Sequence, residues 1–109
     1  MIDLDYIVKA IENNKGTVTK SKLFDFCYDY GVQTADELML PLKVDNTTNP
    51  YIWKQAEAMA NRILVATLAH YRLYDEPVNV DNVLDDVDPK EVAHSEFAVG
   101  VNKYGRKRK

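Results

Sequence analysis

The sequence predicts an all-α fold, in which a small helical bundle forms around one long central helix at about residues 50–75. Apolar residues recur at helical spacing in the first half of the chain. The stretch after Pro50 contains no glycine and no further proline until Pro77, so nothing interrupts a helix there. Beyond Pro77 apolar residues become too sparse for a separate core. We therefore divide the chain into a helical domain, residues 1–77, and an irregular extended C-terminal arm, residues 78–109.

The first helix is expected to begin after Asp3, because its carboxylate can accept hydrogen bonds from the free N–H groups of the first turn. The apolar residues that follow have helical spacing and predict the face toward the core. They are Leu4, Ile7, Val8 and Ile11. Asn13, Asn14 and Gly16 favour the end of this helix, and a short extended link follows.

Two further helices are expected between residues 20 and 41. The second helix begins at about Lys20, and Gly31 is predicted to end it in the left-handed conformation. Thr34 and Glu37 have the spacing of a capping box, which predicts a third helix that Pro41 cuts short. The polar residues 44–49 then predict a loop.

The long helix has the clearest start signal in the chain. Asn49 is expected to cap it, and Pro50 occupies the first helical position, where its missing N–H costs nothing. Ile63, Leu64 and Leu68 lie in its most apolar part, so we expect them to be almost fully buried. Apolar residues occupy two sides of this helix, which the three preceding helices cannot cover. Neighbouring chains are therefore expected to contribute to its burial.

The arm carries two weaker helix signals. Asp81 is expected to cap one or two helical turns. The apolar residues of these turns are expected to face inward: Val83, Leu84 and Val87. Asp88 and Pro89 repeat the cap-and-proline start signal. Residues 97–101 predict extended chain, in which a glycine prevents a strong strand.

Composition places the chain among ordinary water-soluble proteins, since 46% of its residues are hydrophobic and 28% are charged. A length of 109 residues fits one domain with a modest core. A single cysteine excludes an internal disulfide, and neither an export signal nor a membrane-spanning run is visible. The expected location is the cytoplasm, or a host cytoplasm or virion if the protein is viral.

Residues 17–41 can be compared with a DNA-reading helix-turn-helix. Cys27 and Gly31 match the small residue and the glycine that such a unit places four positions apart. The helix that would enter the major groove, however, begins with Asp36 and Glu37, whose charges oppose phosphate binding. The favoured interpretation is a helix–helix corner that builds the core, with a DNA-reading role as the alternative.

Neither a catalytic motif nor a cofactor-binding or metal-binding motif stands out. The acidic stretch 81–91 lacks the glycine of a calcium-binding loop, and helix capping explains its acids more simply. Cys27, His70 and His94 are too few for a structural zinc site. Cys27 lies on an apolar helix face and is expected to be a small buried side chain. We therefore predict a non-enzymatic protein without catalytic residues, metal or cofactor, and without a membrane partner.

Charge is divided unevenly along the chain. The terminal sequence NKYGRKRK, which we name the basic tail, holds five basic residues although the net charge is -3, which leaves -8 for residues 1–101. Residues 75–91, the acidic belt, contain seven acids and only one base. We expect the tail to contact the acidic belt of another copy or a phosphate surface, a solvated end being the alternative. The residues predicted to bind partners are Lys103, Arg106, Lys107, Arg108 and Lys109 in the tail and Asp85, Asp86 and Asp88 in the belt.

The segment PYIWKQAEAMANRILVATLAHYRLYDEP, residues 50–77, resembles in pattern the central helix of tailed-phage head–tail connector proteins. The resemblance implies a small α-helical subunit that assembles as a ring below the portal and extends an arm onto its neighbours. The expected function is thus a structural or assembly protein that forms a homo-oligomer or larger assembly. Two alternatives remain open. One is a nucleic-acid-binding regulator or DNA-packaging subunit that uses the helix-turn-helix-like front. The other is a small inhibitor of a host enzyme.

Overall fold

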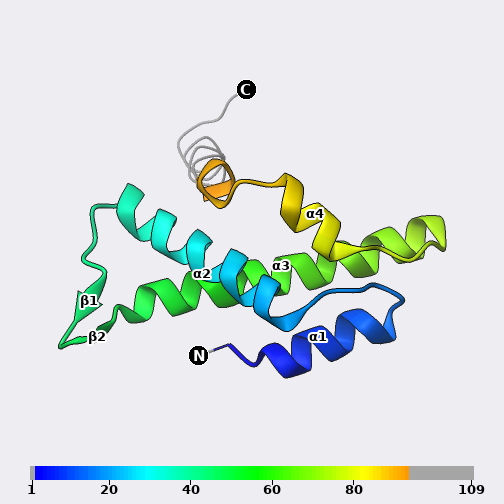
Figure 1. Ribbon diagram of the computed structural model, residues 1–109, viewed down its shortest axis with the longest axis horizontal. Coiled ribbons are helices and arrows are strands. Elements are labelled where there is room, and N and C mark those ends of the chain that lie inside the picture. Colours follow the sequence, from blue (N-terminus) through cyan, green and yellow to red (C-terminus); the bar gives the residue numbers. More distant parts are fainter. Residues whose placement is uncertain (1, 94–109) are drawn as a thin grey trace.

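The computed structural model describes residues 2–93, and the structural statements below concern that part of the chain. Figure 1 shows helices α1 (Leu4–Asn13), α2 (Lys20–Glu37), α3 (Pro50–Tyr74) and α4 (Val80–Asp86). Strands β1 (Lys43–Val44) and β2 (Thr47–Thr48) form a short antiparallel hairpin between α2 and α3. A further helical segment occupies residues 89–93. The predicted all-α fold with one long helix is confirmed.

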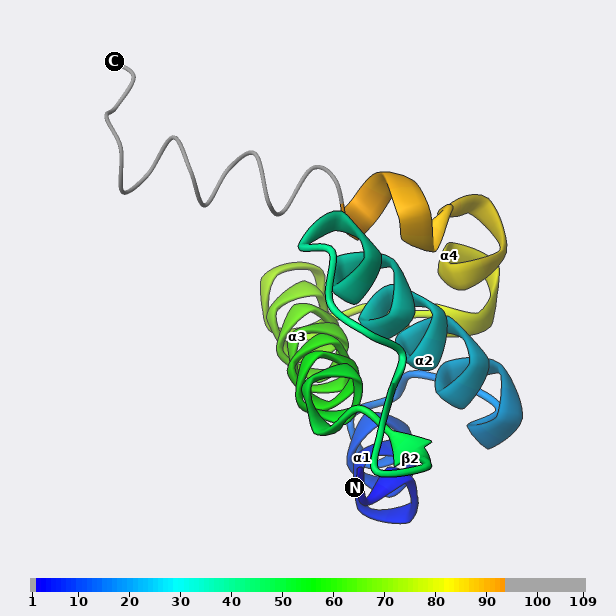
Figure 2. The same cartoon turned by 90° about the vertical axis from the view of Figure 1, so that its left-hand side faces the viewer.

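Helix α2 contacts all three other helices. In Figure 2 it lies between α3 on one side and α4 on the other, and α1 packs below α2 and α3. The side chains enclosed between these helices form a single core. The largest fully buried side chains of the described chain are Ile11, Leu23, Ile52 and Cys27.

Local signals place the starts of α1 and α3 as predicted. The carboxylate of Asp3 accepts a hydrogen bond from the Tyr6 N–H at 3.1 Å, and Leu4, Ile7 and Ile11 of α1 are buried. Asn49 caps α3 by accepting from the Tyr51 N–H at 3.0 Å. Both caps depend on a side chain close in sequence to the N–H that it satisfies, which is why the sequence alone could locate them.

The predicted break between the second and third helices is wrong, because α2 continues from Lys20 through Glu37 without interruption. Gly31 is helical and serves packing instead of a turn. A Cβ atom added to it would lie 3.0 Å from Ile52 Cγ2 and closer still to the Ile52 carbonyl oxygen. Thr34 does not cap a new helix, since its hydroxyl donates to the Gly31 carbonyl at 2.9 Å inside α2. The helix-turn-helix geometry considered for residues 17–41 is therefore not formed.

Residues 44–49, predicted as a loop, include most of the β hairpin. Val44 pairs with Thr47, and Asp45 and Asn46 between them both have positive φ, 53° and 66°, as a two-residue hairpin turn requires. Asn49, which is buried, ties the hairpin to α3. Its side-chain amide donates to the Pro41 carbonyl at 2.7 Å while its oxygen caps the helix.

The expected near-complete burial of Ile63, Leu64 and Leu68 is wrong, because each is only partly buried. The buried residues of α3 lie mainly in its first half, where α2 crosses it. They are Ile52, Ala56, Met59, Ala60 and Thr67. The C-terminal end of α3 extends past α2 and α4, so its own chain covers it less completely.

Residues 78–93 pack against the helices, although the division of the chain at residue 77 remains a prediction. Thr17 forms a parallel bridge with Asn79, and Val80, Leu84 and Ala93 enter the core. Asn79, not Asp81 as predicted, caps α4. The Asp81 carboxylate instead accepts from the Thr19 N–H at 2.9 Å, which joins α4 to the start of α2.

Two other expectations for the arm have different outcomes. Val83 is 50% exposed and does not face inward as predicted, whereas Val87 packs against the core beside the buried Leu84. Asp88 does cap the helical segment that Pro89 begins, accepting from the Lys90 N–H at 3.0 Å. The extended segment predicted at 97–101 lies outside the described residues.

Candidate partner-binding surfaces

The three acids predicted to bind partners stand at the end of α4 and just after it. Asp85 forms an ion pair with Lys22 of α2, and Asp88 is engaged as a helix cap. Asp86 is exposed, and within residues 2–93 its carboxylate makes neither an ion pair nor a hydrogen bond. Of these three acids, Asp86 is therefore the one most available to another molecule.

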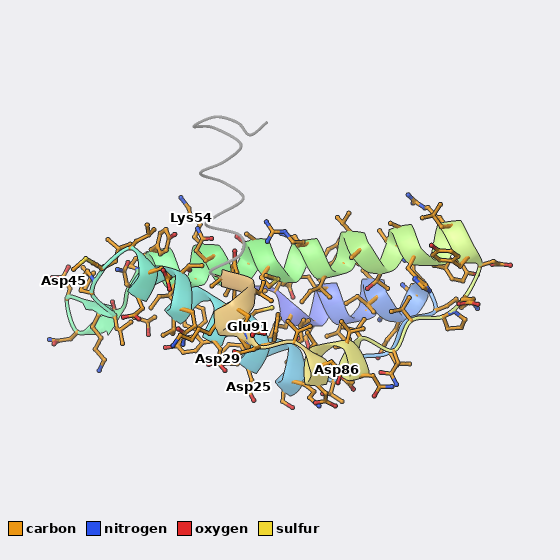
Figure 3. All side chains as sticks on the ribbon, turned by 90° about the horizontal axis from the view of Figure 1, so that it is seen from above. Asp25, Asp29, Asp45, Lys54, Asp86 and Glu91 are labelled. Carbon is orange, nitrogen blue, oxygen red and sulfur yellow. The ribbon has the colours of Figure 1, made fainter. Side chains whose placement is uncertain are left out.

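Helix α2 adds acids that the sequence analysis did not assign to this site. Figure 3 places Asp25 and Asp29 on the side of the molecule where Asp86 and Glu91 lie. Their spacing of four residues puts them on one face of α2, and both are exposed. The sequence contained this spacing, but only the packing of α4 on α2 brings the two acidic segments together. We name Asp25, Asp29, Asp86 and Glu91 the acidic surface.

The five basic residues predicted to bind partners lie outside the described residues: Lys103, Arg106, Lys107, Arg108 and Lys109. Contact between this basic tail and the acidic surface remains a prediction. Opposite charge is its physical basis, and exposed ion pairs typically contribute about 0–1 kcal/mol each.

A second surface, the apolar loop, consists of residues 38–44, which run from the end of α2 through strand β1. Its exposed side chains are Leu38, Met39, Leu40, Leu42 and Val44. The Met39 N–H donates to the Asp36 carbonyl at 3.0 Å and the Leu40 N–H to the Ala35 carbonyl at 2.9 Å. This pair of bonds is the Schellman ending of a helix, in which glycine usually occupies the left-handed position.

Met39 occupies that position with φ of 61° and its side chain is 91% exposed. A residue with a side chain pays roughly 1–2 kcal/mol in this conformation. The sequence analysis missed the apolar loop because it assigned residues 34–41 to a separate helix. The run LMLPLKV was the available signal, since five of its residues are large and apolar.

A third surface lies along the second half of α3. Val65 is 62% exposed and Leu73 76% exposed, and Ala66 and Ala69 between them are exposed as well. Beside this face runs a groove of about 230 Å³, which we name the α3–α4 groove. Its lining is mostly apolar and comprises Ile63, Ala66, Thr67, His70, Val78, Val80, Val83 and Leu84.

The side chains that could take part in chemistry, Cys27 and His70, already make contacts within the fold. Burial raises the pKa of the Cys27 thiol to about 12, so the reactive thiolate is suppressed. His70 lies half-buried with Nε2 3.7 Å from Glu76 Oε1 and its ring against Tyr74. Among residues 2–93, no group of three or more acidic, histidine or cysteine side chains is arranged to hold a metal ion.

A hollow of about 540 Å³ opens between the beginnings of α1 and α2. Ile2, Leu4 and Phe24 supply apolar walls. Lys20 crosses it to Asp5 with an Nζ–Oδ1 distance of 2.8 Å, and this hydrogen bond raises the pKa of Lys20. This ion pair joins the beginnings of α1 and α2.

Comparison of the chain with protein families, with curated proteins and with solved structures finds no match. Within the described residues, none of the helices combines the length and apolar character needed to cross a membrane.

Proposed function

We propose that this protein is a non-enzymatic assembly subunit that packs against copies of itself, of the kind that forms a virion head–tail connector. One observation carries the proposal: large apolar side chains are exposed at both ends of the molecule, in the apolar loop and along the second half of α3. Monomeric proteins rarely leave extended apolar surface in water. Contact with a neighbouring chain would remove that surface from water at a gain of roughly 25 cal/mol per Å².

Charge supports a second contact between copies. The acidic surface carries four carboxylates on α2, α4 and the segment after α4, and five of the last eight residues of the sequence are basic. A single exposed ion pair contributes little, but several pairs repeated around a ring add up. This contact would weaken as salt rises, because ions screen exposed charges beyond about 8 Å at physiological ionic strength.

The test is the mass of the purified full chain across a range of concentrations, measured by sedimentation equilibrium. The chain has a mass of 12.5 kDa, and we expect a multiple of it to dominate as concentration rises. The expected multiple should persist when moderate salt is added at constant protein concentration, because apolar contacts do not depend on screening. A mass of one chain at every concentration would overturn the proposal.

The same measurement in the presence of duplex DNA distinguishes the assembly subunit from a nucleic-acid-binding regulator. The proposed assembly subunit should bind DNA at most through its basic tail, without sequence preference and with strong salt dependence. The continuity of α2 removes the turn that a helix-turn-helix reader needs. Sequence-specific DNA binding by the monomer would favour the regulator over the assembly subunit.

A further inference from the structure

We infer that the apolar loop of one copy docks into the α3–α4 groove of the next copy, with Met39 as its anchor. This inference rests on the proposed function and specifies the two surfaces that meet. The loop and the groove are different surfaces, so their contact would be head-to-tail. Such contacts build a closed ring or an open filament, according to the rotation between successive copies.

The first argument is the conformation of Met39. Glycine would relieve the left-handed backbone at this helix end, yet the chain has a methionine there with its side chain 91% exposed. Within the described chain, the exposed side chain brings no packing that offsets this strain. Strained residues of this kind concentrate at binding sites. A flexible thioether side chain is well suited to filling an irregular apolar groove.

The second argument is that the loop cannot reach its own groove. Hydrogen bonds from Asn49 to the carbonyls of Pro41 and Leu42, at 2.7 and 2.9 Å, fasten the loop to the start of α3. The groove lies beside the second half of the same helix, which is 25 residues long. Figure 1 shows the hairpin at the opposite end of the molecule from the C-terminal end of α3. Any contact between loop and groove must therefore join two copies.

The third argument is complementarity of size and charge. The groove volume of about 230 Å³ accommodates a side chain of several heavy atoms, and Ala66 and Val83 at its mouth are exposed. Lys43 is the one charged residue of the apolar loop. The groove is bordered by acids, since Glu76 lies beside His70 and Asp86 lies one helical turn after Val83. An apolar loop with one lysine thus faces an apolar groove with an acidic rim.

Two variants test the docking, one on each surface. Met39→Gly removes the anchor and relieves the backbone, so we expect Tm to rise by about 4–8 °C while the dissociation constant for self-association rises at least tenfold. Ala66→Lys places a charge at the groove mouth on an exposed helical position and should weaken association to a similar extent without lowering Tm. If Met39 had only a structural role, its replacement by glycine would not raise the stability of the fold and weaken self-association at the same time.

A mixture of the two variants identifies the geometry. Met39→Gly keeps an intact groove and Ala66→Lys keeps an intact loop, so a one-to-one mixture should form a heterodimer that neither variant forms alone. Lys15→Gly is the backbone control, because Lys15 also has positive φ, 70°, and belongs neither to the apolar loop nor to the lining of the groove. Tyr6→Ser is the matched surface control, because Tyr6 is 67% exposed on α1. Both controls should associate as the wild type does.

The outcomes separate this inference from the proposed function. If the wild type remains a single chain at all concentrations, the proposal of self-assembly fails and the docking fails with it. If the wild type associates and both variants associate equally well, only the docking inference is overturned. If one variant alone loses association and mixing restores nothing, the contact joins identical surfaces, and the head-to-tail geometry is wrong.

Discussion

Substitution of Gly31 by alanine provides the sharpest test of how α2 packs on α3. Gly31 is in the interior of an 18-residue helix, where alanine is intrinsically better than glycine by about 1 kcal/mol. The new Cβ would lie 3.0 Å from Ile52 Cγ2, 3.2 Å from the Ile52 carbonyl carbon and closer to its oxygen, whereas ordinary contacts are 3.4–4 Å. Two of these three atoms are backbone, so no side-chain rotation relieves the overlap.

The cost of the overlap outweighs the gain in helix propensity. Helix α3 must move away by several tenths of an ångström, and a gap of 0.5–1 Å forfeits roughly a quarter to a half of each contact energy that it opens. Overpacking of this kind costs about 3 kcal/mol when backbone must move. The net expectation for Gly31→Ala is a loss of about 2 kcal/mol in unfolding free energy, or about 8–16 °C in Tm.

Urea unfolding followed by far-UV circular dichroism and by Trp53 fluorescence measures this loss. Trp53 suits the purpose because its ring lies 5.3 Å from that of Tyr28, across the α2–α3 contact. Ala58→Gly is the matched control, since Ala58 is an exposed interior residue of α3. Ala58→Gly measures the effect of helix propensity alone, and we expect it to lower the free energy of unfolding by about 1 kcal/mol. A gain in stability for Gly31→Ala that mirrors this loss would refute the close packing.

Gly31→Asn distinguishes packing from a helix end. Asparagine tolerates the left-handed conformation, so it would be accepted at a helix-ending position. At a close helix contact it should destabilise the protein more than alanine does, because its side chain is larger. Wild-type stability for Gly31→Asn would restore the two-helix interpretation of residues 20–41.

Three further predictions follow from burial and charge. Ile52→Ala should lower the free energy of unfolding by about 2–5 kcal/mol and Leu64→Ala by clearly less, because Ile52 is fully buried and Leu64 only partly. Equal losses for the two variants in urea unfolding would contradict this. Cys27 should react with a thiol reagent at pH 8 only through unfolding, and rapid labelling of the native chain would show that the thiol is accessible. Its contribution to the free energy of unfolding should decline as pH rises from about 9 toward 12, because burial raises the pKa of the folded thiol to about 12 from 9.0. Deletion of residues 105–109 should leave Tm nearly unchanged but weaken association more at low than at high ionic strength, as sedimentation at two salt concentrations would show. A large drop in Tm would place the tail in the fold.

The sequence by itself determined the elements whose signals are local. Asp3 before α1, the Asn49–Pro50 pair before α3 and the Asp88–Pro89 pair after α4 each place a cap beside the N–H groups that it satisfies. Such interactions span two or three residues, so no knowledge of the rest of the chain is needed. The long helix was predictable for the same reason, since 25 residues pass without an internal breaker.

The tertiary structure decided the role of residues whose partners are distant in sequence. Gly31 carried the signal of a helix end, but the approach of Ile52 requires glycine inside the helix. Asp81 carried the signal of a cap, but its carboxylate bonds to Thr19, 62 residues away. Nothing in the local sequence distinguishes these uses of a glycine or an aspartate.

The same division applies to the candidate surfaces. The sequence determined that acids gather in residues 75–91, but their union with Asp25 and Asp29 depends on how α4 packs against α2. The spacing of its residues showed that α3 is apolar on two sides, whereas only the packing decided that its buried residues lie mainly in its first half. Met39 gave no signal as a residue type, because its exposure and left-handed backbone arise where α2 ends before the hairpin. Burial depends on which elements meet, and chain segments far apart in sequence determine that together.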